Sequence, residues 1–199
     1  MVRIDFSLPL IYTLIITISY WSWIVFEIWL IVRDRGTIKN VSEDNGTRTN
    51  IIFWWSLGII LGIFTIPNLL PKLRIPGNAI MLFVIGIIII ISGIILRFWS
   101  VQSLGKLFRS TVIIQENHEL ITHGPYKHLR NPSYTGVLLT FIGFGIGIGN
   151  WLSLVTLFLI GLVSFVRRIL YEDQALSRRF GCKYDEYRKK TWSLIPFIW

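Results

Sequence analysis

The sequence predicts an all-α, polytopic membrane protein of about five transmembrane helices, with the last two arranged as a helical hairpin. Three observations lead to this fold class. Of the 199 residues, 53% are hydrophobic and only 16% are charged, whereas soluble domains carry about a quarter charged residues. The apolar residues form blocks of about 20 or more, enough to cross roughly 30 Å of hydrocarbon as helix. Basic residues gather at the ends of these blocks, where they suit anionic headgroups and set topology.

Three apolar blocks occupy the N-terminal half, residues 1–100. The first, residues 8–32, is too long for the apolar core of a cleaved signal peptide, so we expect it to be retained as a span. A polar stretch predicts a loop before the second block, residues 51–70. The third block, residues 78–98, follows a Pro-Gly turn and is closed by Arg97. Each block is long enough to span a bilayer as a helix.

The second half, residues 101–199, has a different character. Residues 101–133 are polar and punctuated by glycine and proline, whereas residues 134–166 are apolar apart from an interruption at Gly149 and Asn150. The apolar stretch is either one overlong helix or two short helices. A single span would place two strongly basic segments on opposite faces, against the positive-inside rule. We therefore predict a hairpin, which puts the N-terminus outside and the C-terminus and active site on the cytoplasmic face.

The end of the chain is expected to lie at the membrane surface. Residues 172–190 have helical apolar spacing and a charged opposite face, which predicts an amphipathic helix on the membrane or against the cytosolic loops. Residues 192–199 resemble an interfacial anchor. Cys182 is the only cysteine, so it cannot form an internal disulfide, and it suits a reducing cytoplasmic face.

Several patterns that suggest other functions have structural explanations. The net charge of +9 comes from basic residues at block ends, so we expect no nucleic-acid partner. The glycine run 143–149 imitates a dinucleotide-binding loop but follows no strand, and glycines four apart predict close helix packing in lipid. His118, His123 and His128 lack a partner at ligand spacing, so we expect no metal. Glu27, inside the first span, is open to structural pairing or to a role in the site.

Two segments near the predicted cytoplasmic face hold the strongest pattern. They are residues 118–136 and 168–184, and the predicted hairpin would bring them to one membrane-proximal site. The first segment resembles the H-x-L…G-P-Y…R-H-P-x-Y-x-G signature, and the second the R…E-E…L…F-G…Y signature, of membrane-embedded isoprenylcysteine carboxyl methyltransferases and related phospholipid methyltransferases. The resemblance implies that residues 101–199 form the methyltransferase-like region, where the cytosolic loop and C-terminal helix make a pocket for S-adenosylmethionine. It also implies a lipid-like acceptor that arrives from the bilayer.

The resemblance also implies roles for particular residues. Arg168 and Glu172 match catalytic positions, and Arg130 joins them and Asp173 in an expected mixed-charge cluster. Two positions depart from the family pattern: Asn131 stands where the family usually has His and cannot become cationic, and Asp173 stands where it usually has a second Glu. The expected cofactor-binding residues are His118, Leu120, Gly124, Tyr126, Arg130, Asn131, Pro132, Tyr134, Glu172 and Asp173.

The chemistry of these residue types agrees with methyl transfer. The reaction is an in-line displacement, so positioning supplies most of the catalysis. A carboxylate acceptor, such as that of a prenylated cysteine, needs only a cation like Arg168 to orient it, whereas an amine acceptor has to lose a proton to Glu172 or Asp173. We favour the prenylated cysteine. The alternatives are a phospholipid amine methyltransferase, an NADPH-dependent sterol-reductase-like enzyme, and a non-catalytic lipid-binding membrane protein, which Asn131 would favour.

Overall fold

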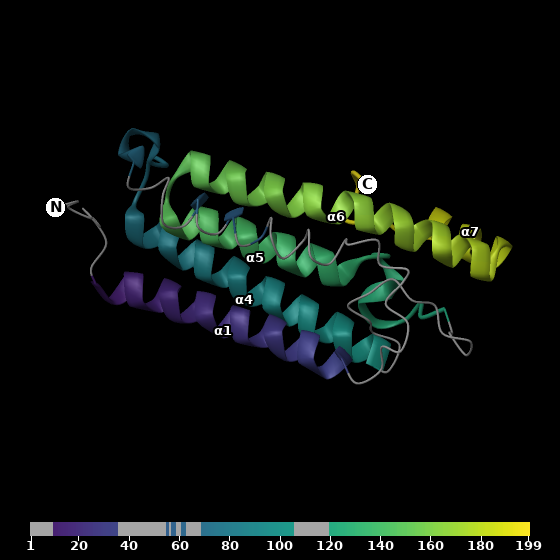
Figure 1. The fold of residues 1–199 in the computed structure, drawn as a ribbon. Coiled ribbons are helices and arrows are strands. Elements are labelled where there is room, and N and C mark those ends of the chain that lie inside the picture. Colours follow the sequence, from purple (N-terminus) through teal and green to yellow (C-terminus); the bar gives the residue numbers. More distant parts are fainter. Residues whose placement is uncertain (1–9, 36–54, 56, 59–60, 63–68, 106–119) are drawn as a thin grey trace.

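The computed structural model describes residues 10–35, 55, 57–58, 61–62, 69–105 and 120–199. Four long helices lie side by side in this part of the chain (Figure 1). They are α1 (Leu10–Arg35), α4 (Ala79–Leu104), α5 (Pro132–Ile148) and α6 (Trp151–Phe180), and a short helix α7 (Cys182–Lys190) follows. The described residues contain no β-strand beyond two isolated bridges. The all-helical prediction is therefore confirmed.

Two of these helices are long and apolar enough to cross a membrane by length and composition. The 18-residue windows of α4 and α6 have mean hydropathies of 3.2 and 1.9. The apolar parts of α1 (Leu14–Leu30) and α5 (Pro132–Ile148) are shorter. Large apolar side chains such as Val25 and Ile95 are exposed on α1 and α4, as a helix bathed in lipid requires.

The second predicted span lies mostly outside the described residues. Its described positions include Gly58 and Gly62, which pack against side chains of α6. A Cβ atom on Gly58 would lie 2.8 Å from Ile160, and one on Gly62 would lie 2.8 Å from Leu157. This part of the block therefore lies against α6.

Helix α4 begins where the sequence predicts but ends later. The Asn78 side chain caps it by accepting from the backbone N–H groups of Ile80 (2.9 Å) and Met81 (3.2 Å). Arg97 closes the apolar block, but the helix continues beyond it to Leu104. Arg97 is buried with a partner inside the bundle, so its charge is not a signal for the helix end.

The chain reverses between α5 and α6 within two residues. Gly149 takes a left-handed conformation with φ of 71°, which ends α5. Asn150 then caps α6, accepting from the backbone N–H groups of Leu152 (3.0 Å) and Ser153 (3.2 Å). Its amide also donates to the Leu70 carbonyl at 3.1 Å, which ties the turn to the residues before α4.

The end of α6 differs from the expected arrangement. The helix runs unbroken for 30 residues, past the last apolar residue of the block, and includes both Arg168 and Glu172. The predicted single helix over residues 172–190 was wrong, because Gly181 interrupts it with φ of 52°. That positive φ suits glycine and lets α7 turn back against α6.

Glycines bring α4 and α5 into backbone contact. A Cβ atom on Gly93 would lie 2.5 Å from the Gly136 carbonyl oxygen, and one on Gly143 would lie 2.8 Å from the Gly86 carbonyl oxygen. Only residues without a side chain permit such an approach, as in other membrane helix pairs. The packing interpretation of the glycine run is therefore confirmed for Gly143 and for Gly145, where a Cβ atom would lie 2.5 Å from the Leu154 Cα. A Cβ atom on Gly147 would meet its nearest atom at 3.7 Å, although the Gly147 backbone itself lies against Gly86.

Candidate active site

The start of α5 and the second half of α6 share a closed group of three polar side chains. The Tyr134 hydroxyl donates to Oε1 of Glu172 at 2.5 Å. Arg168 Nε donates to the Tyr134 oxygen at 2.7 Å and to the same Glu172 oxygen at 3.0 Å. Arg168 and Glu172 are four residues apart on one helix, so both face α5. We call this group the Arg168–Tyr134–Glu172 triangle.

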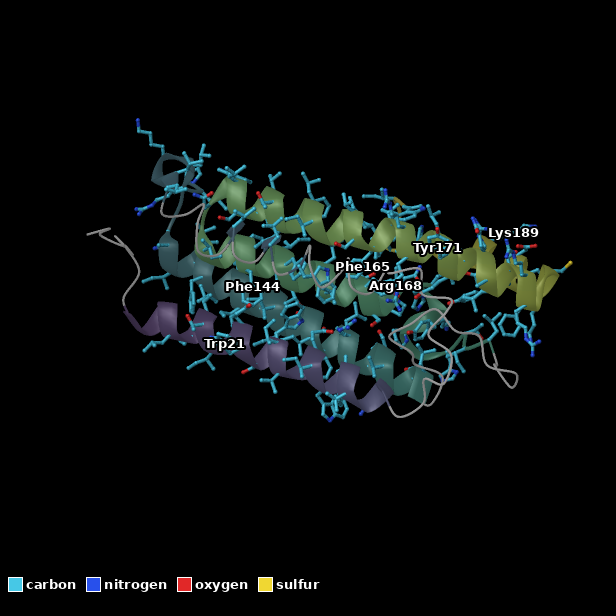
Figure 2. The ribbon with its side chains drawn as sticks, in the orientation of Figure 1. Trp21, Phe144, Phe165, Arg168, Tyr171 and Lys189 are labelled. Atoms are coloured by element: carbon cyan, nitrogen blue, oxygen red, sulfur yellow. The ribbon has the colours of Figure 1, made fainter. Side chains whose placement is uncertain are left out.

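Burial and aromatic packing hold the triangle in place. Arg168 is only 5% exposed, and its guanidinium carbon lies 5.9 Å from the centroid of the Tyr134 ring. That ring stacks on Phe165, with centroids 4.7 Å apart and planes 22° apart. Figure 2 shows Phe165 and Arg168 along α6 within the bundle, whereas Lys189 lies out on α7. Because a buried guanidinium requires a counter-charge, Glu172 and Tyr134 restrict where Arg168 can point.

A second charged pair lies next along α6. Arg130, just before α5, has its Nε 3.9 Å from Oδ1 of Asp173. The Tyr184 hydroxyl of α7 donates to the same carboxylate oxygen. Asp173 directly follows Glu172, so the mixed-charge cluster expected from the sequence forms as two adjacent pairs, Arg168–Glu172 and Arg130–Asp173.

The C-terminal segment, residues 188–193, forms hydrogen bonds with Arg130 and Asn131, which precede α5. Arg130 Nη1 donates to the backbone carbonyls of Arg188 (3.0 Å) and Thr191 (2.5 Å). The Asn131 amide donates to the Ser193 carbonyl at 3.0 Å, and the Asn131 backbone N–H donates to that carbonyl at 3.1 Å. The Asn131 side chain therefore bonds to the C-terminal segment. Sequence reasoning missed Ser193 and Thr191, since neither carries a pattern of its own.

Three tyrosines line this end of the molecule outside the spans. The Tyr187 hydroxyl donates to the Tyr126 carbonyl at 2.7 Å, which ties α7 to the short helix η4 (Gly124–Lys127). Burial raises the pKa of Tyr126 and Tyr187 above the ordinary value. Burial also raises the pKa of Tyr184, and the hydrogen bond to Asp173 raises it further. All three phenols therefore stay protonated at neutral pH, which lets Tyr184 and Tyr187 act as hydrogen-bond donors.

The other predicted cofactor residues lie around η4, with one exception. His118 falls outside the described residues. Leu120 is half-buried, and Pro132 is the first residue of α5, where its fixed φ suits the start of a helix. Gly124 has φ of 59°, and a Cβ atom there would lie 2.9 Å from the Ser103 hydroxyl near the end of α4. Gly124 is therefore needed both for its conformation and for close packing.

No group of three metal-ligating side chains occurs among the residues that the structure describes. His123 and His128 are both exposed.

An ion pair between Glu27 and Arg97 joins α1 to this region. The sequence left structural pairing of Glu27 open but did not indicate its partner. Arg97 Nη2 donates to Oε2 of Glu27 at 2.5 Å, and Nε lies 2.5 Å from Oε1. Arg97 Nη1 also donates to the Ser133 hydroxyl at 2.8 Å. Glu27 is therefore structurally paired, although the sequence contained no signal that Arg97 would be its partner.

Comparison with known proteins agrees with this architecture. The family model for phospholipid methyltransferases matches residues 81–183, which cover α4, α5 and α6. The chain is 32% identical over 158 residues to a probable protein-S-isoprenylcysteine O-methyltransferase of Oryza sativa subsp. indica, which covers 77% of this chain and 83% of that protein. It is 36% identical over 115 residues to protein-S-isoprenylcysteine O-methyltransferase A of Arabidopsis thaliana, over 57% of this chain and 58% of that one.

A solved structure has a similar fold. It is that of the eukaryotic intramembrane Ras methyltransferase ICMT, an isoprenylcysteine carboxyl methyltransferase, with a TM-score of 0.56 and 26% sequence identity. The likeness covers 83% of this chain and 56% of that chain.

The buried charged triangle within a bundle of apolar helices, together with these similarities, defines an integral membrane methyltransferase. The chain belongs to the phospholipid methyltransferase family, in the group that contains the protein-S-isoprenylcysteine O-methyltransferases. The predicted family and enzyme class are confirmed, which favours methyl transfer over the reductase and non-catalytic alternatives.

Proposed function

We propose that this protein transfers a methyl group from S-adenosylmethionine to the carboxylate of a prenylated cysteine. The Arg168–Tyr134–Glu172 triangle is the observation that carries the proposal. Within the described residues, the hydrogen bonds of Arg168 all use Nε. A carboxylate bound to the two Nη groups would have the paired geometry in which a guanidinium binds best.

The acceptor's charge explains why this arrangement suits a carboxylate. A cysteine carboxylate is ionised at neutral pH and needs no base, so the protein has to orient it and exclude water. Glu172 and Tyr134 fix the Arg168 guanidinium by two short hydrogen bonds, which reduces the entropy lost when the acceptor binds. Arg168 is thus assigned to orient the acceptor, and Glu172 and Tyr134 to orient Arg168.

The residues before α5 fit the methyl donor. S-adenosylmethionine supplies an electrophilic methyl group on a sulfonium, and it also carries a carboxylate and an amine. Arg130 Nε is buried and makes no hydrogen bond within the described residues, so a carboxylate would satisfy it. Asp173 offers the opposite charge 3.9 Å away. The residues proposed to bind S-adenosylmethionine are His118, Leu120, Gly124, Tyr126, Arg130, Asn131, Pro132, Tyr134, Glu172 and Asp173.

We also propose five spans, with α5 and α6 as the final hairpin, residues 1–100 as the N-terminal three-span part and residues 101–199 as the catalytic region. In this topology the N-terminus is outside, and the C-terminus and site are cytoplasmic. Cys182 is exposed and is the only cysteine, so it is a natural probe. A membrane-impermeant maleimide is expected to label it in inverted vesicles but not in intact cells. Labelling in intact cells would contradict the topology.

The experiment uses purified protein, tritiated S-adenosylmethionine, a prenylated cysteine with a free carboxylate, and an aminophospholipid. Alkali-labile label on the prenylated cysteine is the expected result, because carboxyl methyl esters hydrolyse in base. Alkali-stable label on the aminophospholipid alone would overturn the carboxylate proposal and indicate amine methylation, with Glu172 or Asp173 as the base. Arg168→Ala is expected to remove turnover yet retain donor binding. Arg167→Ala, at an exposed neighbouring arginine, is the matched control.

A further inference from the structure

The Glu27–Arg97 ion pair lies inside the helix bundle, away from the proposed reacting groups. Glu27 is 8% exposed on α1 and Arg97 is 7% exposed on α4. The two-point contact between carboxylate and guanidinium holds both side chains in one orientation. Arg97 uses its remaining Nη1 on Ser133, donating to the hydroxyl at 2.8 Å and to the backbone carbonyl at 3.4 Å. The group therefore joins α1 and α4 to the first turn of α5.

Stability alone explains this pair poorly. Charges within a membrane-embedded bundle cost free energy, and a buried ion pair can often be replaced by apolar residues at no loss of stability. The neighbouring α4 positions facing α5 are Gly93 and Gly86, which pack by close backbone contact. The face therefore needs no charge for helix association, and an arginine there requires another explanation.

The Glu27–Arg97 pair holds the first turn of α5, which carries Tyr134 of the candidate site. Ser133 lies between Pro132 and Tyr134, and the hydroxyl of Tyr134 is one corner of the Arg168–Tyr134–Glu172 triangle. A shift of the first turn of α5 would move that hydroxyl relative to Arg168. Because Arg97 also touches Gly136, whose Cβ position is 2.8 Å from the Arg97 backbone nitrogen, the first turn is held closely on this side.

We infer that Glu27 and Arg97 are positioning residues for methyl transfer: Glu27 orients Arg97, Arg97 holds Ser133, and Ser133 sets the place of Tyr134 in the triangle. This inference rests on the proposed function for its kinetic consequence. It assigns a role to α1, which lies outside the residues matched by the family model. The N-terminal helix would thus act on the site without touching substrate.

The test separates positioning from stability with paired substitutions. Glu27→Gln leaves the Arg97 charge uncompensated, so we expect both a lower melting temperature and slower turnover. The double variant Glu27→Leu/Arg97→Met removes both charges. We expect its melting temperature to return toward that of the wild type, while kcat stays about tenfold lower because Ser133 is no longer held. Recovery of kcat together with the melting temperature would overturn the inference.

A second readout does not depend on activity. In the absence of S-adenosylmethionine, backbone hydrogen exchange in residues 131–136 is expected to be faster in the double variant than in the wild type. Exchange in α7 is expected to be unchanged. Unchanged exchange in residues 131–136 would also overturn the inference. If the wild type methylates neither acceptor, the proposed function fails, but the exchange comparison still decides whether the pair positions α5.

Two milder variants keep the test decisive where the double variant does not fold. Ser133→Ala removes only the hydroxyl bond to Arg97, so we expect lower kcat with little change in melting temperature. Unchanged kcat in Ser133→Ala would count against the inference. Ser100→Ala is the matched control, because Ser100 is buried less than one turn from Arg97 on α4. Within the part of the chain that the structure describes, its hydroxyl bonds only to the Leu96 carbonyl of its own helix. It is expected to leave kcat and exchange unchanged.

Discussion

The Tyr134 hydroxyl lies 2.5 Å from Oε1 of Glu172 and 2.7 Å from Nε of Arg168, so one phenol joins the carboxylate and the guanidinium on the same face of α6. It donates to one and accepts from the other, and its ring stacks on Phe165 below them. Arg168 and Glu172 could form an ion pair without it, since they are four residues apart on one helix. The contribution of α5 is to fix the direction in which that pair points.

Tyr134→Phe is expected to lower kcat about tenfold, because the Arg168–Glu172 pair remains but loses its fixed orientation. The protein should lose about 2 to 3 kcal/mol of stability, because both lost hydrogen bonds are to charged groups, while the stacked ring is retained. Single-turnover methyl transfer and thermal melting measure the two effects. Tyr171→Phe, at an exposed tyrosine on α6, is the control. Equal kcat values in Tyr134→Phe and the wild type would show that the phenol has no positioning role.

Asn131→His is expected to retain turnover within about threefold of the wild type. The Asn131 amide donates to Ser193, and an imidazole N–H can donate in its place. Asn131→Ala leaves the buried Ser193 carbonyl with one donor fewer, and we expect it to lose about 1 to 2 kcal/mol of stability. Thermal melts and steady-state rates distinguish the two variants. A large gain of activity in Asn131→His would indicate that the side chain acts in the chemistry and not only in the hydrogen bond to Ser193.

Gly143→Ala is expected to destabilise the protein, whereas Gly147→Ala is expected to be tolerated. The added Cβ atom would lie 2.7 Å from the Ile90 side chain and 2.8 Å from the Gly86 carbonyl oxygen in the first case, but 3.7 Å from its nearest neighbour in the second. Overpacking of this kind costs about 1 to 3 kcal/mol. Melting temperatures in detergent measure the difference. Equal losses in the two variants would contradict the α4–α5 packing described above.

The docking of α7 is expected to weaken in alkaline solution. Burial and the hydrogen bond to Asp173 raise the pKa of Tyr184 in the folded state. A raised folded-state pKa means that the stabilisation is complete below the unfolded value of about 10 and is lost as pH rises through the folded value. Difference titration of tyrosinate absorbance, wild type minus Tyr184→Phe, should place this group above the ordinary range. A normal titration near pH 10 would mean that the bond to Asp173 is not maintained.

Local sequence accounts for most of the fold elements. Blocks of apolar residues predict the helices because lipid requires every backbone group to bond within its own helix. Asn78 and the Gly149–Asn150 pair mark helix boundaries because capping depends on residues only two or three positions away. The family motifs similarly located Arg168, Tyr134 and Glu172.

Other features were not visible locally. Arg97 marked the end of an apolar block without showing that the helix continues beyond it, and helical spacing suggested one continuous helix over residues 172–190. The structure places Arg97 inside the bundle, and Gly181 breaks the second helix. The partner of Arg97 is Glu27, 70 residues away, and the bond from Tyr184 to Asp173 joins two different helices.

The sequence by itself thus determined the class of protein and the helical character of its segments, and it indicated the candidate site residues, because hydropathy, capping and motif are local properties. The tertiary structure decided which charges pair, Glu27 with Arg97 and Arg130 with Asp173, and that the Asn131 amide bonds to the C-terminal segment. Those pairings depend on how helices far apart in the chain pack together. A buried charge takes whichever partner the packing brings within reach, and periodicity along one helix does not encode that partner.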